Sequence, residues 1–158
     1  SYKDWSKDRF ITVSIIGDKG SGVTSLVNMF LKDLERKEQV IITKLNHKIY
    51  TPEDYYSFFS ELFEQEKFGS NDEIINYLNR SDSFRIVIIE NLQHMFLKQV
   101  HGFDCMNLLF DLMANTMKKV LWIGIYTLHS WRYLDRTIHI SNYFTSEVFV
   151  EPLHEATI

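Results

Sequence analysis

The stretch that decides the fold covers residues 11–25 and reads Ile-Thr-Val-Ser-Ile-Ile-Gly-Asp-Lys-Gly-Ser-Gly-Val-Thr-Ser. Residues 11–16 are mostly β-branched, which is typical of a strand that is buried on both faces of a sheet. Three of the six glycines then fall between positions 17 and 22. Apolar residues at positions 26, 27, 30, 31 and 34 recur at helical spacing. The stretch therefore predicts a strand, a glycine-rich loop and a helix.

The loop follows the phosphate-binding pattern G-x-x-x-x-G-K-S/T except at one position. Gly17 and Gly22 occupy the glycine positions, Thr24 occupies the hydroxyl position that binds Mg²⁺, and Val23 stands where the pattern has lysine. Glycines allow backbone angles that turn successive N–H groups into one concavity, and a helix N-terminus adds positive potential. Because this part of an anion site needs no side chain, the pattern predicts a phosphate site without the ammonium group. The alternative is a glycine-rich turn that binds nothing.

A second motif follows the most apolar run of the chain. Residues 86–89 read Ile-Val-Ile-Ile, and Glu90 and Asn91 come directly after them. An acid at the end of a buried strand can hold Mg²⁺ through water, so Thr24 and Glu90 are the predicted metal-binding residues. The alternative is that a charged residue simply marks where the strand leaves the core. We expect residues 86–89 to form a central strand next to residues 11–16.

The remaining pattern alternates strands with helices. Strands are predicted at 40–45, 120–126 and 148–150, and helices after Pro52, at 72–79, at 103–117 and around Trp131. Such alternation implies parallel crossovers, so we predict an α/β three-layer sandwich, with a mainly parallel five-stranded sheet and helices on both faces. After Pro52, an aromatic stripe follows helical spacing and consists of Tyr55, Phe58, Phe59, Leu62 and Phe63. This stripe is predicted to pack on the sheet rather than to bind bases or a membrane.

With both motifs in place, the chain resembles the nucleotide-binding αβ lobe of the AAA+ class of P-loop ATPases, with degenerate Walker A and Walker B motifs. The resemblance covers nearly the whole chain in element order. It implies ATP and Mg²⁺ as ligands, and other protein subunits or further copies of the chain as partners. It also implies that residues 1–158 are one domain from a longer polypeptide, without the helical lid of the family.

The resemblance assigns roles to two groups of residues. Those implied to bind nucleotide are Gly17, Asp18, Lys19, Gly20, Ser21, Gly22, Val23, Thr24 and Ser25. Those implied to take part in catalysis are Glu90, Asn91, Thr127 as the sensor of the γ-phosphate, and Arg136 as the arginine that reaches a neighbouring subunit's nucleotide.

Two departures from the family pattern bear on activity. The family carries Asp then Glu in its acid motif, and this chain has Glu90 and Asn91. An amide cannot accept a proton at neutral pH, and Val23 supplies no charge, so we expect weak or absent hydrolysis in a switch or scaffold lobe. An active ATPase that uses Lys19 or a partner's cation is one alternative. A protein-interaction module that binds no nucleotide is the other.

Composition narrows the possible partners. Lys and Arg number 17 against 21 Asp and Glu, a net charge of -4, which gives no strong nucleic-acid signal. No apolar run is long enough to span a bilayer.

The single cysteine, Cys105, excludes an internal disulfide and favours a reducing, cytoplasmic setting. His94 and His101 lie near Cys105 in the sequence, but their spacing matches no zinc pattern.

Overall fold

A computed structural model describes residues 12–18, 20, 22–32, 39–97 and 101–151 of the chain. Within these residues the centre of the molecule is a five-stranded sheet in the order β2-β3-β4-β1-β5, and every pair of neighbouring strands is parallel. The strands are β1 (Thr12–Ile16), β2 (Gln39–Lys44), β3 (Arg85–Glu90), β4 (Val120–Tyr126) and β5 (Ser146–Phe149).

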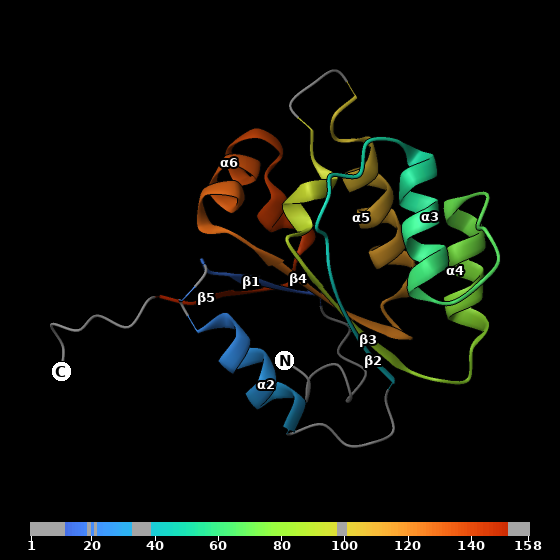
Figure 1. The fold of residues 1–158 in the computed structure, drawn as a ribbon, viewed down its shortest axis with the longest axis horizontal. Helices are drawn as coiled ribbons and strands as arrows, with labels where there is room; N and C mark the ends of the chain where they lie inside the picture. The colour runs from blue at the N-terminus through green and yellow to red at the C-terminus, as the bar shows by residue number, and fades with distance from the viewer. Residues whose placement is uncertain (1–11, 19, 21, 33–38, 98–100, 152–158) are drawn as a thin grey trace, which may run out of the picture.

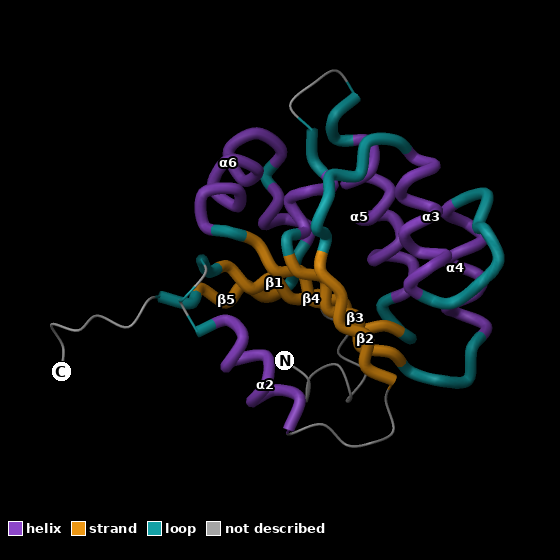
Figure 2. Tube along the Cα trace, in the orientation of Figure 1, coloured by secondary structure: helices purple, strands orange, loops and turns teal. Residues whose placement is uncertain are grey.

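Helices cover both faces of this sheet, as Figures 1 and 2 show. One face carries α2 (Val23–Lys32), and the other carries α3 (Pro52–Leu62), α4 (Asn71–Arg80), α5 (Asp104–Thr116) and α6 (Leu128–Ile138). Two short 3₁₀ turns, η1 (Leu92–Met95) and η2 (Ile140–Tyr143), follow β3 and precede β5. The predicted three-layer α/β sandwich is confirmed. No helix in the described ranges combines the length and apolar character that crossing a membrane requires.

Our prediction of which strand lies next to β3 was wrong. We expected residues 86–89 to lie next to residues 11–16, but β4 lies between β3 and β1 and pairs with both. The physical reason is that β1, β3 and β4 are all buried on both faces. Three strands of the same apolar character carry no signal that says which of them are neighbours.

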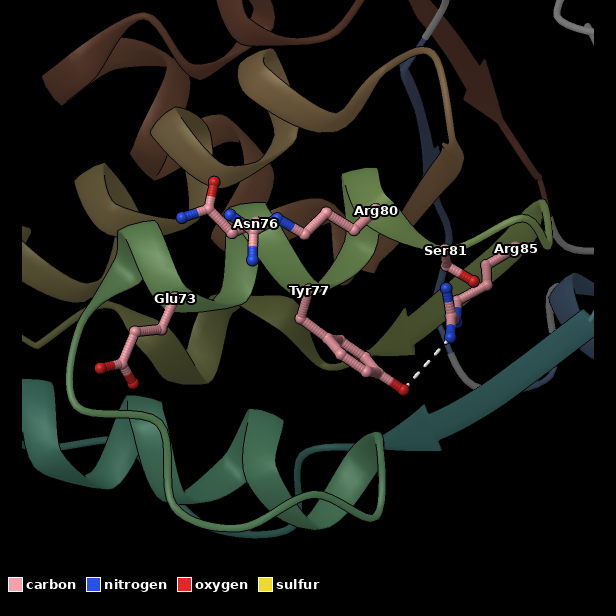
Figure 3. A pocket seen from close by; sticks show the side chains of 6 residues that line it. All are labelled: Glu73, Asn76, Tyr77, Arg80, Ser81 and Arg85. Carbon is pink, nitrogen blue, oxygen red and sulfur yellow. Dashed lines mark hydrogen bonds between the residues drawn. The ribbon is translucent and has the colours of Figure 1, made fainter.

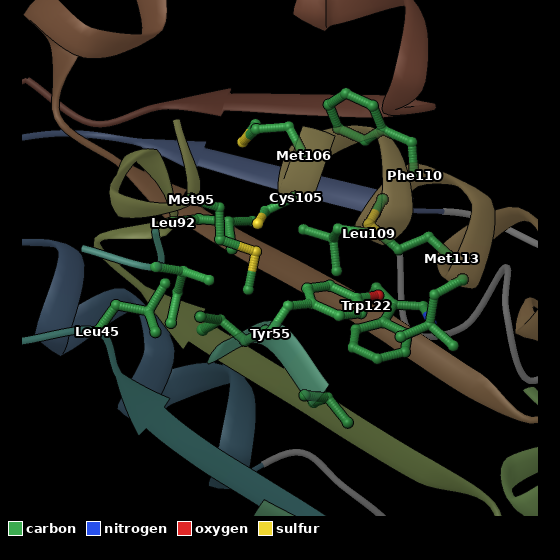
Figure 4. Close-up of a cluster of buried hydrophobic side chains, with 14 of the residues drawn as sticks. Leu45, Tyr55, Leu92, Met95, Cys105, Met106, Leu109, Phe110, Met113 and Trp122 are labelled. Atoms are coloured by element: carbon green, nitrogen blue, oxygen red, sulfur yellow. The ribbon is translucent and has the colours of Figure 1, made fainter. Parts of the chain in front are cut away.

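The larger core lies between the sheet and the helices α3 to α6 (Figure 4). Tyr55 and Phe59 of the aromatic stripe are completely buried there, with ring centroids 4.9 Å apart, so the prediction that the stripe packs on the sheet is confirmed. The helix that presents them begins at a capping box, in which the Thr51 hydroxyl accepts from the Asp54 N–H and the Asp54 carboxylate accepts from the Thr51 N–H. The predicted helix start at Pro52 is thereby confirmed.

The smaller core lies under α2 on the opposite face. Ile86 and Ile88 of β3 are fully buried there, with Val13 and Ile15 of β1 and Val27 of α2. Alternate residues of β3, Val87 and Ile89, belong to the larger core. Strand β3 therefore contributes to both cores, as the apolar run predicts.

This double burial predicts a large effect for a truncation in β3. Ile88→Ala removes packed methyl groups and leaves a cavity, so we expect a loss of about 2–5 kcal/mol in the free energy of unfolding. The matched control is Ile42→Ala on β2, where the side chain is 53% exposed and the expected loss is below about 1 kcal/mol. Urea unfolding of both variants measures the two values, and equal losses would contradict the burial of β3 described above.

Candidate functional site

The sheet register brings the two sequence motifs to one edge. Ile16 of β1 pairs with Tyr126 of β4, and Ile89 of β3 pairs with Gly124 of β4. Because all strands run parallel, the residues that follow them leave the sheet at the same, carboxyl edge. The loop after β1, Thr127 after β4 and Glu90 at the end of β3 therefore lie along this edge. It is the edge at which open α/β sheets bind ligands.

The loop between β1 and α2 depends on two glycines for its backbone path. Gly20 has φ of +86° and Gly22 has φ of +97°, angles that residues with side chains rarely adopt. Space is not the constraint, since a Cβ at Gly20 would meet nothing within 4 Å and one at Gly22 would meet Val150 at 3.9 Å. Positive φ, for which a loop needs glycine, is thus present at Gly20 and Gly22. Lys19 and Ser21 lie outside the described residues.

The first turn of α2 follows the loop directly. The Leu26 N–H donates to the Gly22 carbonyl at 3.0 Å, whereas the N–H groups of the first helical turn have no acceptor within the helix. Thr24 and Ser25 are exposed beside the loop. Val23 is half-buried and packs against the smaller core. The helix start therefore offers N–H groups and hydroxyls, but its lysine position holds an apolar side chain.

Asp18 and Thr127 connect the loop to the start of α6. One carboxylate oxygen of Asp18 accepts from the Leu128 N–H at 3.1 Å, and the Gly17 N–H donates to the Tyr126 carbonyl at 3.0 Å. The Thr127 hydroxyl caps α6 by accepting from the Ser130 N–H at 3.4 Å, and it donates to the Ser130 hydroxyl at 2.9 Å. Thr127, which the resemblance implies as the sensor, thus lies at the carboxyl edge, where its side chain takes part in a helix cap.

The acid motif ends in a sharp turn. Glu90 is half-buried, and its carbonyl accepts from the Leu45 N–H at 3.0 Å. Asn91 has φ of +57° and ψ of +41°, in the left-handed region that asparagine tolerates better than most residues. Its side-chain amide lies 3.5 Å from the Leu45 carbonyl. Asn91 therefore serves the turn into η1, and its side-chain amide supplies no proton acceptor of the kind that a carboxylate would.

A hollow of about 180 Å³ opens beside the loop. Its lining combines apolar and charged residues: Ile16, Gly17, Asp18, Leu128, Arg132, Phe149, Val150 and Glu151. This volume is below the roughly 300–1,000 Å³ of a typical small-molecule pocket, so it suits one part of a larger ligand. Arg132 is a charged residue that we did not single out from the sequence. Its position four residues after Leu128, one helical turn along α6, is the signal that could have found it.

Arg136 and the possible metal-binding residues do not line this hollow. Arg136 is exposed on α6, one turn beyond Arg132. The described parts of the chain contain no group of three His, Cys, Asp or Glu residues that could hold a metal ion. His101 and Asp104 lie 3.7 Å apart, and both are well exposed.

Comparison with solved structures shows which proteins share this fold. No family model and no curated protein matches the chain. The solved Aeropyrum pernix ORC2 protein, in its ADPNP-ADP complexes, is similar over 93% of this chain and 43% of its own, with a TM-score of 0.62 and 11% identity. Aeropyrum pernix ORC1 in complex with DNA matches over 91% and 40%, with a TM-score of 0.59 and 15% identity. C. elegans PCH-2 is similar over 90% of this chain and 36% of its own, with a TM-score of 0.50 and 17% identity.

The fold is that of the AAA+ P-loop ATPases. At such low identities the likeness shows the fold and leaves the chemistry to the residues described above. The chain spans less than half the length of each of these solved structures.

The buried thiol of Cys105 is predicted to react slowly in the native chain. Burial raises the pKa of its thiol to about 11, so the thiol stays protonated at pH 8, whereas a free thiol with a pKa of about 8.5 is partly ionised. We expect Ellman's reagent at pH 8 to react with the native chain roughly a hundredfold more slowly than with the chain in guanidinium. Equal rates in the two states would contradict an inert, buried cysteine.

Proposed function

We propose that this chain is a nucleotide-binding AAA+-like lobe that binds MgATP at residues 17–25 and hydrolyses it weakly or not at all, as a nucleotide-dependent switch or scaffold. The observation that carries the proposal is the pair of positive φ angles at Gly20 and Gly22, in a loop between β1 and α2 at the carboxyl edge of a parallel sheet. Positive φ at glycine lets a loop turn successive N–H groups toward one point, which is how a backbone concavity binds phosphate.

Different residues at this edge bind different parts of the ligand. The first-turn N–H groups of α2 face the phosphates, and the Thr24 hydroxyl and the Glu90 carboxylate hold Mg²⁺, directly or through water. The hollow lined by Ile16, Leu128 and Phe149 takes an apolar part of the nucleotide such as the base. Support comes from the fold shared with Aeropyrum pernix ORC2, which was solved with ADPNP and ADP.

Weak hydrolysis follows from two side chains. Val23 packs against the smaller core and brings no ammonium group to the transferred phosphate. Asn91 cannot accept a proton from water, and its amide lies near the Leu45 carbonyl. Arg136, exposed on α6, remains the residue that we propose to act on a neighbouring subunit, and the whole assembly would then be an oligomer.

A second candidate function is a protein-interaction module without nucleotide. The observation that favours it is that the polar groups beside the loop already have partners. The Asp18 carboxylate accepts from Leu128, and the Thr127 hydroxyl is bonded to Ser130. Such a module would have the same fold, and ATP would not bind to it or stabilise it.

Thermal unfolding separates the two functions. A ligand that binds only the folded state stabilises it by about 2.7 kcal/mol at a concentration one hundred times its Kd, so MgATP should raise the melting temperature by several degrees. Thr24→Ala should reduce the shift seen with Mg²⁺, whereas Ser57→Ala, an exposed hydroxyl on α3, should leave it unchanged. An unchanged melting temperature at millimolar MgATP would favour the interaction module.

A charge at position 23 tests the geometry of the site. A lysine there would extend from the first turn of α2 toward the phosphates, and charge-assisted hydrogen bonds contribute roughly 1.5–3 kcal/mol each. Val23→Lys should therefore tighten MgATP binding about tenfold or more in titration calorimetry. Phosphate release should stay at background until Asn91→Glu is added to the same chain. Lack of ATP binding to Val23→Lys would contradict a phosphate site in this loop.

A further inference from the structure

At the opposite, amino end of the strands, Arg85 is a buried cation that has no acidic partner among the described residues. It is the first residue of β3 and is 6% exposed. Its Nη2 donates to the Tyr77 hydroxyl at 3.2 Å, and its guanidinium carbon lies 5.1 Å from the centroid of the Tyr77 ring and 5.9 Å from that of Phe63 (Figure 3). Nη1 is buried and forms no hydrogen bond within the described part of the chain.

A guanidinium removed from water is costly unless a carboxylate or further acceptors balance it. No ion pair joins Arg85 to a carboxylate of the described residues. Aromatic rings stabilise a cation through their faces, but they do not satisfy its N–H donors. Within the described residues, the charge of Arg85 is therefore not balanced by a carboxylate, and an incoming anion would balance it.

Two hollows meet at Arg85 and Tyr77. One, of about 570 Å³, is lined by α4 and the turn after it, with Glu73, Arg80 and Ser81. Glu73 lies at the far end of that hollow from Arg85 in Figure 3, and its carboxylate accepts from the Gly69 N–H. The other hollow, of about 520 Å³, is lined by residues 39–42 of β2 and residues 62–65 at the end of α3, with the acid Glu64 among them. Glu64 forms no ion pair with Arg85 in the described part of the chain. An anion can thus approach Arg85 from beside the edge strand.

The edge strand β2 has backbone groups that pair with none of the described residues. β2 is the last strand of the described sheet, and the N–H groups of Gln39 and Leu45 donate to carbonyls of Phe84 and Glu90 on the β3 side. By the two-residue repeat of a strand, the N–H and C=O groups of Val40, Ile42 and Lys44 point away from β3. No hydrogen bond from these three N–H groups to a described residue is present. Ile42 is also 53% exposed. Such an edge is a template for another strand.

We propose that β2 pairs with an extended segment of a partner protein, and that an acidic side chain of this segment enters the hollow beside β2 and pairs with Arg85. Backbone hydrogen bonds to the edge supply the alignment, and the buried charge selects an acidic sequence. A second copy of the chain pairing through β2 would not complete the site, because residues 39–44 carry no acid. The site lies at the other end of the strands from the loop and does not depend on nucleotide binding.

Three labelled peptides test the proposal by fluorescence anisotropy with the 158-residue chain. The first is a seven-residue peptide that alternates valine and glutamate, with blocked ends. The second replaces each glutamate by glutamine, and the third carries N-methyl groups on alternate residues of the first. We expect saturable binding of the first peptide, binding at least tenfold weaker for the second, and no detectable binding of the third.

Two arginine variants connect the binding to the site. Arg85→Gln should weaken binding of the glutamate peptide at least tenfold, and should leave the weak binding of the glutamine peptide unchanged. Arg80→Gln is the matched control, because Arg80 lines the other hollow but not the one beside β2. Circular dichroism confirms that each variant is folded. If Arg85→Gln does not fold, the glutamate and glutamine peptides on the unchanged chain decide the question.

Four results would overturn the proposal. Equal binding of the glutamate and glutamine peptides, or no binding of either, would leave Arg85 with a packing role between its two aromatic neighbours. Binding that survives Arg85→Gln would place the acidic side chain elsewhere. Dimers in light scattering that Ile42→Lys abolishes, with no peptide bound, would assign the edge to a second copy. None of these results depends on ATP, so failure here is distinct from failure of the nucleotide site.

Discussion

Strand β4 is the constraint on which the rest of the structure depends. All seven of its residues are buried, and it pairs with β1 on one side and β3 on the other. Its register is held by side chains as well as by the ladder, since the Trp122 Nε1 donates to the Thr116 hydroxyl at 2.8 Å within the larger core. A shift by one residue would turn Trp122 to the wrong face and separate the loop after β1 from the end of β3. Both motifs meet at one edge because β4 fixes the two strands that precede them.

The elements could be predicted from the sequence where a local signal decides them. The cap at Thr51 and the apolar run before Glu90 are such signals, and both elements form as expected. The order of the strands could not be predicted, because β1, β3 and β4 are equally apolar and their pairing depends on crossovers between distant segments. The same limit applies to Arg132, which lines the hollow beside the loop only because α6 starts directly after β4. The burial of Arg85 beside Tyr77 and Phe63 likewise depends on the packing of α3 and α4 against β3, which no local pattern predicts.

The candidate nucleotide site separates two requirements that usually occur together. Holding phosphate requires donors that point into a concavity, and the backbone supplies them when Gly20 and Gly22 adopt positive φ. Transferring phosphate requires charge that follows the moving group and a base for water. Here Val23 packs against the smaller core and Asn91 belongs to a turn, at the two positions where the AAA+ pattern carries its lysine and its base. Under the proposed function, such a loop would bind nucleotide and hydrolyse it weakly or not at all.

The loop is also mechanically connected to α6. The Asp18 carboxylate accepts from the Leu128 N–H, one of the first-turn donors of α6 that has no acceptor within the helix. Arg132 lies one turn further along and lines the hollow beside the same loop. Any ligand that repositions Asp18 must therefore leave that N–H without its acceptor or move the helix start with it. Because α6 also carries the exposed Arg136, the surface most directly affected by the state of the loop is the one that this helix presents to its surroundings.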